Sequence, residues 1–181
     1  LELEKIELII NKIAADPEDE DIRRVELELW KKIRTMARKG RRTGLGITAE
    51  GDMLAALGLR YGTPEATAFA VKVQKTLALE AYRASVKMAA ERGAFEIFDA
   101  RKEEKNPMIG RIREADPELY AEMVKHGRRN IAMLTIAPTG TTSLMSQTTS
   151  GIEPVFRPVY KRRRKINPSD QDAKVAFVDD M

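Results

Sequence analysis

Apolar side chains recur along most of this chain at the three- and four-residue spacing that places them on one face of an α-helix. Several of these stripes are flanked by helix-start or helix-stop signals, such as Asp16-Pro17 before one stripe and Gly93 after the longest. Together they predict helices over residues 1–15, 17–38, 52–57, 65–92 and 117–126. The stripe of the second helix, which we expect to be buried, consists of Ile22, Val25, Leu29, Ile33 and Met36.

Three shorter apolar segments lack the helical spacing and are typical of strands. They cover residues 43–48, 131–137 and 155–160. Helices interleaved with a few strands predict an α/β fold. Residues 167–181 show neither pattern, and we expect them to form a weakly ordered tail.

The composition is that of an ordinary globular protein, because 43% of the 181 residues are hydrophobic and 33% are charged. No apolar run approaches the ~20 residues of a membrane span, so we expect a cytoplasmic protein with no membrane partner. The absence of cysteine excludes disulfides, a thiolate nucleophile and a thiolate metal site. The single histidine, His126, cannot build a zinc site, and we expect it to complement the carbonyl end of its helix.

Charge is distributed unevenly along the chain. Residues 1–28 hold ten acidic and four basic side chains, a balance of −6, so the remainder carries +10 to reach the net charge of +4. The basic residues of the remainder gather within 31–42, at 128–129 and within 161–165. Such runs suit phosphate-bearing partners, from nucleotides to nucleic acid, although a solvated face or a contact between domains would give the same pattern.

The most informative stretch is the apolar segment 131–137, which is followed by Pro-Thr-Gly-Thr-Thr-Ser. A glycine-containing, hydroxyl-rich turn that opens a helix is suited to hold an anion, because free N–H groups and hydroxyls converge there. Gly140 would let the backbone approach the ligand closely. The turn is not a Walker A loop, since no Gly-Lys-Ser/Thr follows at the required spacing. A helix cap and tight turn without a ligand would have the same sequence.

A second glycine-containing stretch, residues 44–49, matches the relaxed G-x-G-x-x-A pattern of dinucleotide-binding folds. Its context does not, because the preceding residues are basic and helical and no acid stands ~20 residues beyond it. We therefore interpret Gly44 and Gly46 as packing glycines. Asp52 and Glu153 are lone acids beside glycines, and either could fix a loop or contact a ligand.

Three segments taken together resemble a known enzyme family. They are Arg41-Arg42-Thr43-Gly44-Leu45-Gly46-Ile47-Thr48 with the glycine-rich residues 51–62, Asn130 to Ser143 with its Pro-Thr-Gly-Thr, and Ser150-Gly151-Ile152-Glu153-Pro154-Val155-Phe156 leading to 160–163. In this order, from about Ile22 to Lys165, the chain is similar to the adenosylcobalamin-dependent (class II) ribonucleotide reductases.

The resemblance implies a fold, an activity and a cofactor. The fold would be a ten-stranded α/β barrel of the ribonucleotide reductase type, of which residues 1–166 would form a helix-rich, C-terminal part. The activity would be the radical replacement of the ribose 2′-hydroxyl of a ribonucleotide by hydrogen. Adenosylcobalamin would generate the thiyl radical on a finger-loop cysteine within an N-x-C-x-E motif.

The resemblance also implies a binding site in this chain. Residues that would hold the substrate phosphates are Pro138, Thr139, Gly140, Thr141 and Thr142. We call these five residues the phosphate loop. The neighbouring Gly-Ile-Glu-Pro would be a structural segment of the barrel wall, and no catalytic or metal-binding residue is assigned.

Two departures from the family limit what this chain can do. It has no N-x-C-x-E motif and no cysteine, so we expect it not to reduce ribonucleotides alone. Ala49-Glu50 stands where the family usually has Gly-Leu. We expect the remaining half of the reductase, or a second copy of the chain, as partner. Two alternatives stay open: a non-catalytic basic module that binds nucleic acid or protein, and a decayed fragment retained as a soluble domain.

Overall fold

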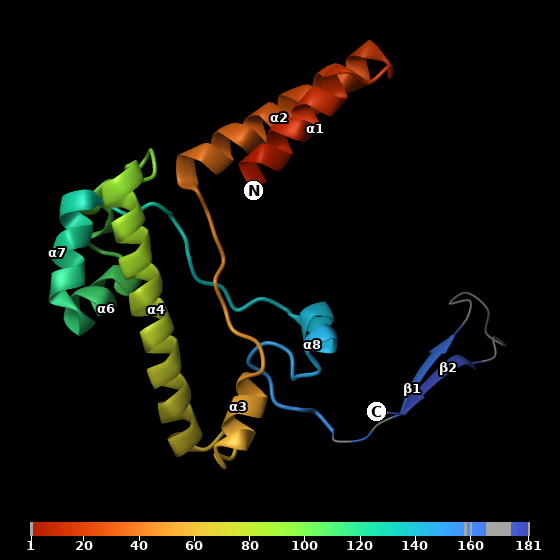
Figure 1. The fold of residues 1–181 in the computed structure, drawn as a ribbon, viewed down its shortest axis with the longest axis vertical. Helices are drawn as coiled ribbons and strands as arrows, with labels where there is room; N and C mark the ends of the chain where they lie inside the picture. Colours follow the sequence, from red (N-terminus) through yellow and green to blue (C-terminus); the bar gives the residue numbers. More distant parts are fainter. Residues whose placement is uncertain (1, 158, 160, 166–174, 181) are drawn as a thin grey trace. The chain divides into compact units, whose positions relative to one another are not determined.

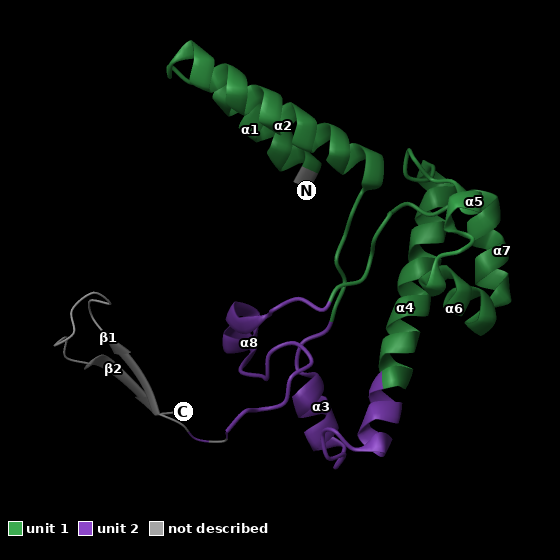
Figure 2. Cartoon of the chain, turned by 180° about the vertical axis from the view of Figure 1, so that it is seen from behind, with its two compact units in different colours: residues 1–46, 71–135 green, residues 47–70, 136–181 purple. Residues whose placement is uncertain are grey.

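The computed structural model describes residues 2–157, 159, 161–165 and 175–180 (Figure 1). Its elements are α1 (Glu2–Ala14), α2 (Glu20–Gly40), α3 (Glu50–Ala56), α4 (Pro64–Arg92), α5 (Ala100–Glu103), α6 (Pro107–Ala115), α7 (Pro117–His126), α8 (Gly140–Ser146), β1 (Lys161–Lys165) and β2 (Val175–Asp180). The chain divides into two compact units (Figure 2). Unit 1 comprises residues 1–46 and 71–135, and unit 2 comprises residues 47–70 and 136–181.

All five expected helices are present and correspond to α1, α2, α3, α4 and α7. The apolar spacing does not predict α5 or α6, which are short, whereas α8 begins at the Pro-Thr-Gly-Thr-Thr-Ser turn that we expect to open a helix. Local capping explains one of them, since the Asn106 side chain accepts the Met108 N–H at 3.0 Å and Pro107 occupies the first turn of α6. An Asn-Pro pair that suggests a chain break from the sequence therefore starts a helix.

The strand predictions are wrong in extent. The expected strands 43–48 and 131–137 make only a single parallel bridge, between Leu45 and Leu134. A regular strand needs a continuous ladder of neighbours, and here each extended segment pairs with the other over a few residues only. Of the third expected strand, residues 155–157 and 159 are not in a strand, and residues 158 and 160 lie outside the described part.

Regular strand pairing is found near the end of the chain. β1 and β2 pair in antiparallel fashion, from Lys161 opposite Asp180 to Lys165 opposite Val175, with one irregularity in register. β2 lies within the expected tail, whose residues 167–174 and 181 are outside the described part. The described residues are thus mainly helical, and the α/β expectation is met only in part.

α1 and α2 form an antiparallel helical hairpin (Figure 1). Ile6 and Ile10 of α1 are buried, and Glu7 on the same helix accepts hydrogen bonds from Arg34 and Arg38 of α2 at 3.0 and 2.9 Å. α2 therefore turns its basic face toward α1, and part of the basic run within residues 31–42 is used inside the hairpin.

The apolar stripe of α2 is not buried, contrary to our expectation. Its five members, Ile22, Val25, Leu29, Ile33 and Met36, are 38–66% exposed. The helical spacing correctly places them on one face, but α1 packs against a different face, as the contacts of Glu7 show. In the described residues this stripe is an open apolar surface.

The core of unit 1 joins α4, α6 and α7. Its buried apolar members are Tyr82, Val86, Ile109, Ile112, Leu119, Met123 and Met133. Asp116 lies between α6 and α7, and its carboxylate accepts the Leu119 N–H at 2.9 Å, which starts α7. Its other oxygen is bound by Arg83 of α4 at 2.5 Å. Apolar burial and one capping carboxylate therefore fix these three helices together.

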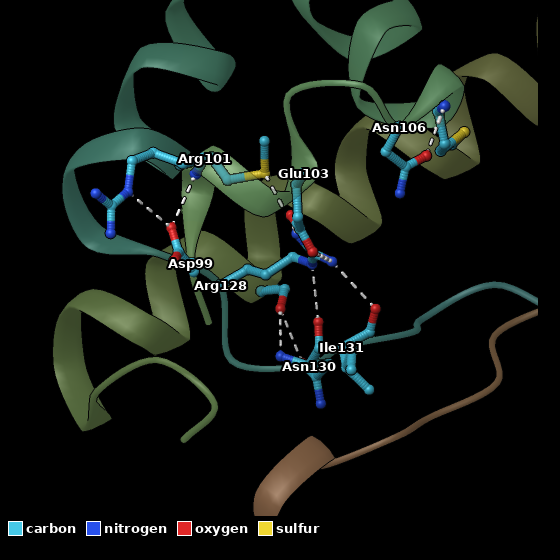
Figure 3. A network of polar contacts seen from close by, with 10 residues as sticks. Asp99, Arg101, Glu103, Asn106, Arg128, Asn130 and Ile131 are labelled. Carbon is cyan, nitrogen blue, oxygen red and sulfur yellow. Dashed lines mark hydrogen bonds and ion pairs between the residues drawn. The ribbon is translucent and has the colours of Figure 1, made fainter. Parts of the chain in front are cut away.

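A buried ion pair completes this core (Figure 3). The Arg128 side chain is 3% exposed, and both of its terminal nitrogens bind the carboxylate of Glu103, one of them at 2.6 Å. Its Nε donates to the carbonyl of Asn130 at 3.0 Å, and Nη2 donates to the carbonyl of Ile131 at 3.1 Å. The guanidinium also lies 5.4–5.8 Å from the ring centres of three aromatic side chains, Tyr82, Phe95 and Phe98.

Arg129 and Asn130, which follow Arg128, also form hydrogen bonds within unit 1. Arg129 donates from Nη1 to the carbonyls of Arg92 and Gly93, both at 2.9 Å, and so satisfies the end of α4. Asn130 exchanges hydrogen bonds with Ser85, at 2.9 and 3.1 Å. The basic pair 128–129, one of the runs that suit a phosphate partner, is therefore structural.

Candidate phosphate-binding site

The phosphate loop leads into α8 within unit 2. Pro138 and Gly140 are exposed, whereas Thr139 is half-buried. The N–H groups of Gly140, Thr141 and Thr142 lie in the first turn of α8, where helix geometry supplies no carbonyl partner. The hydroxyls of Thr141 and Thr142 are exposed and have no hydrogen-bond partner among the described residues. The loop therefore has three N–H groups and two hydroxyls that have no hydrogen-bond partner among the described residues.

The hydroxyl of Thr139 is used differently from the expectation. It accepts the Gly151 N–H at 2.6 Å and lies 3.0 Å from the hydroxyl of Thr48 and 3.2 Å from that of Ser150. It makes no capping bond to α8, although threonine at this position commonly caps a helix. Of the five predicted ligands, Thr139 thus joins three segments of the chain, and its side chain faces the protein.

Asp52 contacts the same region from the first turn of α3. Its carboxylate accepts the N–H of Thr149 at 2.8 Å, and its own N–H donates to the Thr149 hydroxyl at 3.3 Å. The Thr48 hydroxyl donates to the Thr149 carbonyl at 3.2 Å. The question left open by the sequence is answered for Asp52, since its carboxylate fixes a loop.

Two glycines permit this arrangement. Gly151 has a φ of +54°, in the left-handed region that favours glycine. A Cβ on Gly51 would lie 2.7 Å from the carbonyl oxygen of Glu153 and 2.8 Å from Cα of Pro154. The backbone of α3 therefore approaches the 153–154 segment more closely than any other residue at position 51 would allow.

The other glycine pattern, G-x-G-x-x-A, has a packing role in unit 1. A Cβ on Gly44 would lie 2.9 Å from the side chain of Thr135, and one on Gly46 would collide with the Thr135 carbonyl oxygen. These close approaches confirm the interpretation of Gly44 and Gly46 as packing glycines.

His126 is the last residue of α7, where a capping role was expected, and its Nε2 lies 3.3 Å from the carboxylate of Glu122.

No group of His, Asp or Glu among the described residues could hold a metal ion. None of the helices in the same residues is long and apolar enough to cross a membrane. The basic run 161–165 forms β1, and its side chains lie outside the described part.

A comparison with known protein families identifies the family to which the chain belongs. Residues 22–178 match the family model of the ribonucleotide reductase barrel domain. The chain belongs to this ribonucleotide reductase family. The match covers the phosphate loop, the Asp52 segment and the 149–151 segment, and it confirms the resemblance stated from the sequence.

Individual reductases give the same result. The chain is 36% identical over 127 residues to a vitamin B12-dependent ribonucleoside-diphosphate reductase of Mycobacterium tuberculosis, which covers 70% of this chain and 16% of the relative. It is 33% identical over 142 residues to a reductase of the same name from Thermoplasma acidophilum, which covers 78% and 16%. A ribonucleoside-diphosphate reductase subunit alpha of Treponema pallidum is 30% identical over 134 residues, which covers 69% and 15%. The matched region thus spans about one sixth of each relative.

The residues that sequence reasoning missed are those that hold the reductase loop in place. The sequence pattern does not single out Thr48, Thr149 or Ser150, and it leaves the role of Asp52 open. A signal was present, because Thr48, Asp52 and Ser150 lie inside the three segments that carry the resemblance. The structure shows these segments meeting at Thr139 and Gly151.

Proposed function

We propose that this chain is a segment of a vitamin B12-dependent ribonucleotide reductase and supplies the loop that binds the substrate phosphates. The observation that carries the proposal is the division of roles within the loop. The hydroxyl of Thr139 is held by the protein, while the hydroxyls of Thr141 and Thr142 and three N–H groups have no partner among the described residues. N–H and O–H donors gathered in one turn match the acceptor oxygens of a phosphate.

Each residue of the phosphate loop has its own role in this proposal. Thr141 and Thr142 donate from hydroxyl and backbone, and Gly140 donates from a backbone that no side chain shields. Pro138 fixes φ of the chain entering the loop, which limits its freedom before the ligand binds. Thr139 supports the loop through its contacts with Thr48 and Gly151.

The activity of the whole enzyme is part of the proposal. The relatives are named ribonucleoside-diphosphate reductases, so we assign a ribonucleoside diphosphate as substrate and radical reduction to the deoxyribonucleotide as reaction. Because this chain has no cysteine, it is an oxidoreductase only together with the remaining part of the reductase, and residues 1–166 contribute part of the barrel domain. The open stripe of α2 is a surface on which that remaining part would pack. A cytoplasmic location stays a prediction.

Adenosylcobalamin is the cofactor that the proposal implies, since relatives are named vitamin B12-dependent. The described residues do not fit it. A cavity of about 340 Å³ beside α3 is far smaller than a corrin with its nucleotide tail, and it is lined mainly by apolar atoms of α3, the 58–61 turn and residues 154–155. We therefore assign the cofactor to no residue of this chain.

The alternative of a basic module that binds nucleic acid or protein receives no support. Arg34, Arg38, Arg128 and Arg129, which belong to the basic runs, all have partners inside unit 1. The comparisons find reductases instead.

Titration of the ¹⁵N-labelled chain with ADP or CDP tests the proposal. We expect the amide signals of Gly140, Thr141 and Thr142 to shift, and the Thr141→Ala/Thr142→Ala variant to bind about 30-fold more weakly, as expected for two lost hydrogen bonds of about 1 kcal/mol each. Thr76→Ala is the matched control, because Thr76 is an exposed threonine of α4 whose hydroxyl bonds the carbonyl of Lys72. Unchanged loop signals at saturating nucleotide would contradict the proposal.

A further inference from the structure

The phosphate loop is held by residues outside it. We infer that Thr48 and Asp52 are positioning residues that keep the phosphate loop open for its ligand, an inference that rests on the proposed function. Neither residue belongs to the loop, and both act through other groups: Thr48 through the hydroxyl of Thr139, and Asp52 through the backbone of Thr149.

The first contact set is centred on the Gly151 N–H. This group donates to the hydroxyl of Thr139 at 2.6 Å and to that of Thr48 at 3.2 Å, and the two hydroxyls lie 3.0 Å apart. The Thr48 hydroxyl in turn donates to the Thr149 carbonyl at 3.2 Å. Each hydroxyl can donate one proton and accept twice, so these contacts are mutually compatible.

The second contact set holds the other side of this arrangement. The carboxylate of Asp52 accepts the Thr149 N–H at 2.8 Å while the N–H of Asp52 donates to the Thr149 hydroxyl at 3.3 Å. The backbone adds two bonds, from Ala49 N–H to the Thr149 carbonyl and from Glu50 N–H to the Gly151 carbonyl, both at 3.2 Å. The 149–151 segment, which carries the acceptor and donor partners of Thr139 and Thr48, is thus fixed on α3.

The consequence for the loop follows from what Thr139 would otherwise do. A threonine just before a helix ordinarily turns its hydroxyl to accept an N–H of the first turn, here that of Thr141 or Thr142. Those N–H groups are the ones proposed to bind phosphate. Because Thr48 and Gly151 engage the Thr139 hydroxyl, no such bond forms. Loss of the Thr48 hydroxyl would leave the Thr139 hydroxyl with Gly151 and Ser150 as partners, so Thr139 could more readily turn to cap α8 and compete with the ligand.

Two pairs of variants of the 181-residue chain test this inference. Thr48→Val removes the hydroxyl at nearly constant shape, and Thr48→Ser keeps it. Asp52→Ala removes the acceptor of the Thr149 N–H, and Asp52→Asn keeps an acceptor oxygen. Thr76→Val in α4 is the control, since that hydroxyl bonds only within its own helix.

The first readout needs no ligand. In Thr48→Val and Asp52→Ala we expect shifted amide signals for Thr141 and Thr142 and faster hydrogen exchange at Gly151, whereas Thr48→Ser, Asp52→Asn and the control resemble the wild type. The second readout is ADP affinity, which we expect to fall about fivefold in Thr48→Val, the value of one neutral hydrogen bond, and to return in Thr48→Ser.

The outcomes separate the two proposals. If the wild type binds no ADP, the proposed function fails, while the ligand-free signals still decide whether Thr48 and Asp52 position the loop. Wild-type loop signals and wild-type affinity in Thr48→Val would overturn the inference, and so would equal losses in Thr48→Val and Thr48→Ser. If Thr48→Val loses the dispersed signals of unit 2 altogether, the Asp52→Ala and Asp52→Asn pair decides by the same two readouts.

Discussion

Unit 1 and unit 2 are held together by different kinds of contact. In unit 1, seven buried apolar side chains of α4, α6, α7 and the following segment pack together, and one buried ion pair fixes the chain beside them. In unit 2, the segments around residues 48–52, 139 and 149–151 are joined by hydrogen bonds of hydroxyls and one carboxylate. Two glycines of unit 2 allow backbone approach and a left-handed turn.

The difference explains why the candidate site lies in unit 2. Apolar burial is non-directional and tolerates small shifts of the groups that it buries. Hydrogen bonds place individual atoms, because their strength depends on distance and angle. The proposed binding of one phosphate by three N–H groups would require the second kind of support. We therefore predict that substitutions in unit 1 mainly lower the free energy of unfolding, whereas substitutions in unit 2 mainly alter the conformation of the phosphate loop.

The largest expected effect tests the ion pair of unit 1. Arg128→Ala leaves the carboxylate of Glu103, which is 17% exposed, without its partner and removes a cation that packs among three aromatic rings. We expect the free energy of unfolding of unit 1 to fall by about 4 kcal/mol, because an unpaired buried charge is costly. Native-state hydrogen exchange, followed separately for amides of α7 and α8, measures the effect in each unit.

The matched control is an arginine with the same type of partner at the surface. Arg101 pairs with Asp99 at 3.4 Å, and its side chain is 91% exposed. Arg101→Ala should cost less than about 1 kcal/mol, as exposed ion pairs usually do. Equal costs for the two variants would show that burial does not set the value of the Arg128 pair, and the contrast between the units would lose its main support.

A smaller effect is expected from the close backbone approach in unit 2. In Gly51→Ala the new Cβ would lie 2.7 Å from the Glu153 carbonyl oxygen, and neither backbone can move without disturbing the Thr149 contacts of Asp52. We expect a loss of about 2 kcal/mol, typical of overpacking, together with shifted amide signals in the phosphate loop. Thermal unfolding and the amide spectrum together measure both.

Gly110→Ala in α6 is the control for this substitution. A Cβ there meets nothing within 4 Å, so the gain in helix propensity should leave stability unchanged or raise it by up to about 1 kcal/mol. If Gly51→Ala behaves in the same way, the close approach of α3 to residues 153–154 is not a constraint on unit 2.

The sequence predicts more of the helices than of their surroundings. The stripe of α2 correctly identifies which side chains share a face, yet Leu29 is 54% exposed, because periodicity carries no information about what covers that face. Residues 131–137 are apolar enough for a strand, but strand formation depends on neighbours far along the chain, and only the Leu45–Leu134 bridge forms.

The site shows the same division between local and distant information. The turn sequence predicts a donor-rich loop before α8, and the structure places free donors there. The turn sequence does not indicate the hydrogen-bond partners of the Thr139 hydroxyl, since they lie 91 residues away in Thr48 and 12 residues away in Gly151. The resemblance to reductases groups these segments, but only the fold shows that their atoms are in contact.

The smallest expected effect concerns the capping carboxylate of unit 1 and is measured by pH. The N–H of Leu119, and then the bond from Arg83, lower the pKa of Asp116 below its ordinary value of about 3.9. A carboxyl whose folded-state pKa is depressed stabilises the fold above its unfolded-state pKa, and this stabilisation is lost as pH falls through the folded-state pKa. The difference in unfolding free energy between the wild type and Asp116→Ala should therefore be constant at neutral pH and shrink below about pH 4.

Asp99→Ala is the control, because it removes a peripheral capping carboxylate whose pKa is also lowered. It should give a smaller difference with the same pH dependence. A wild-type advantage that persists undiminished at the lowest pH would mean that Asp116 acts through packing instead of charge, and unit 1 would then depend on apolar burial even more strongly than the comparison with unit 2 assumes.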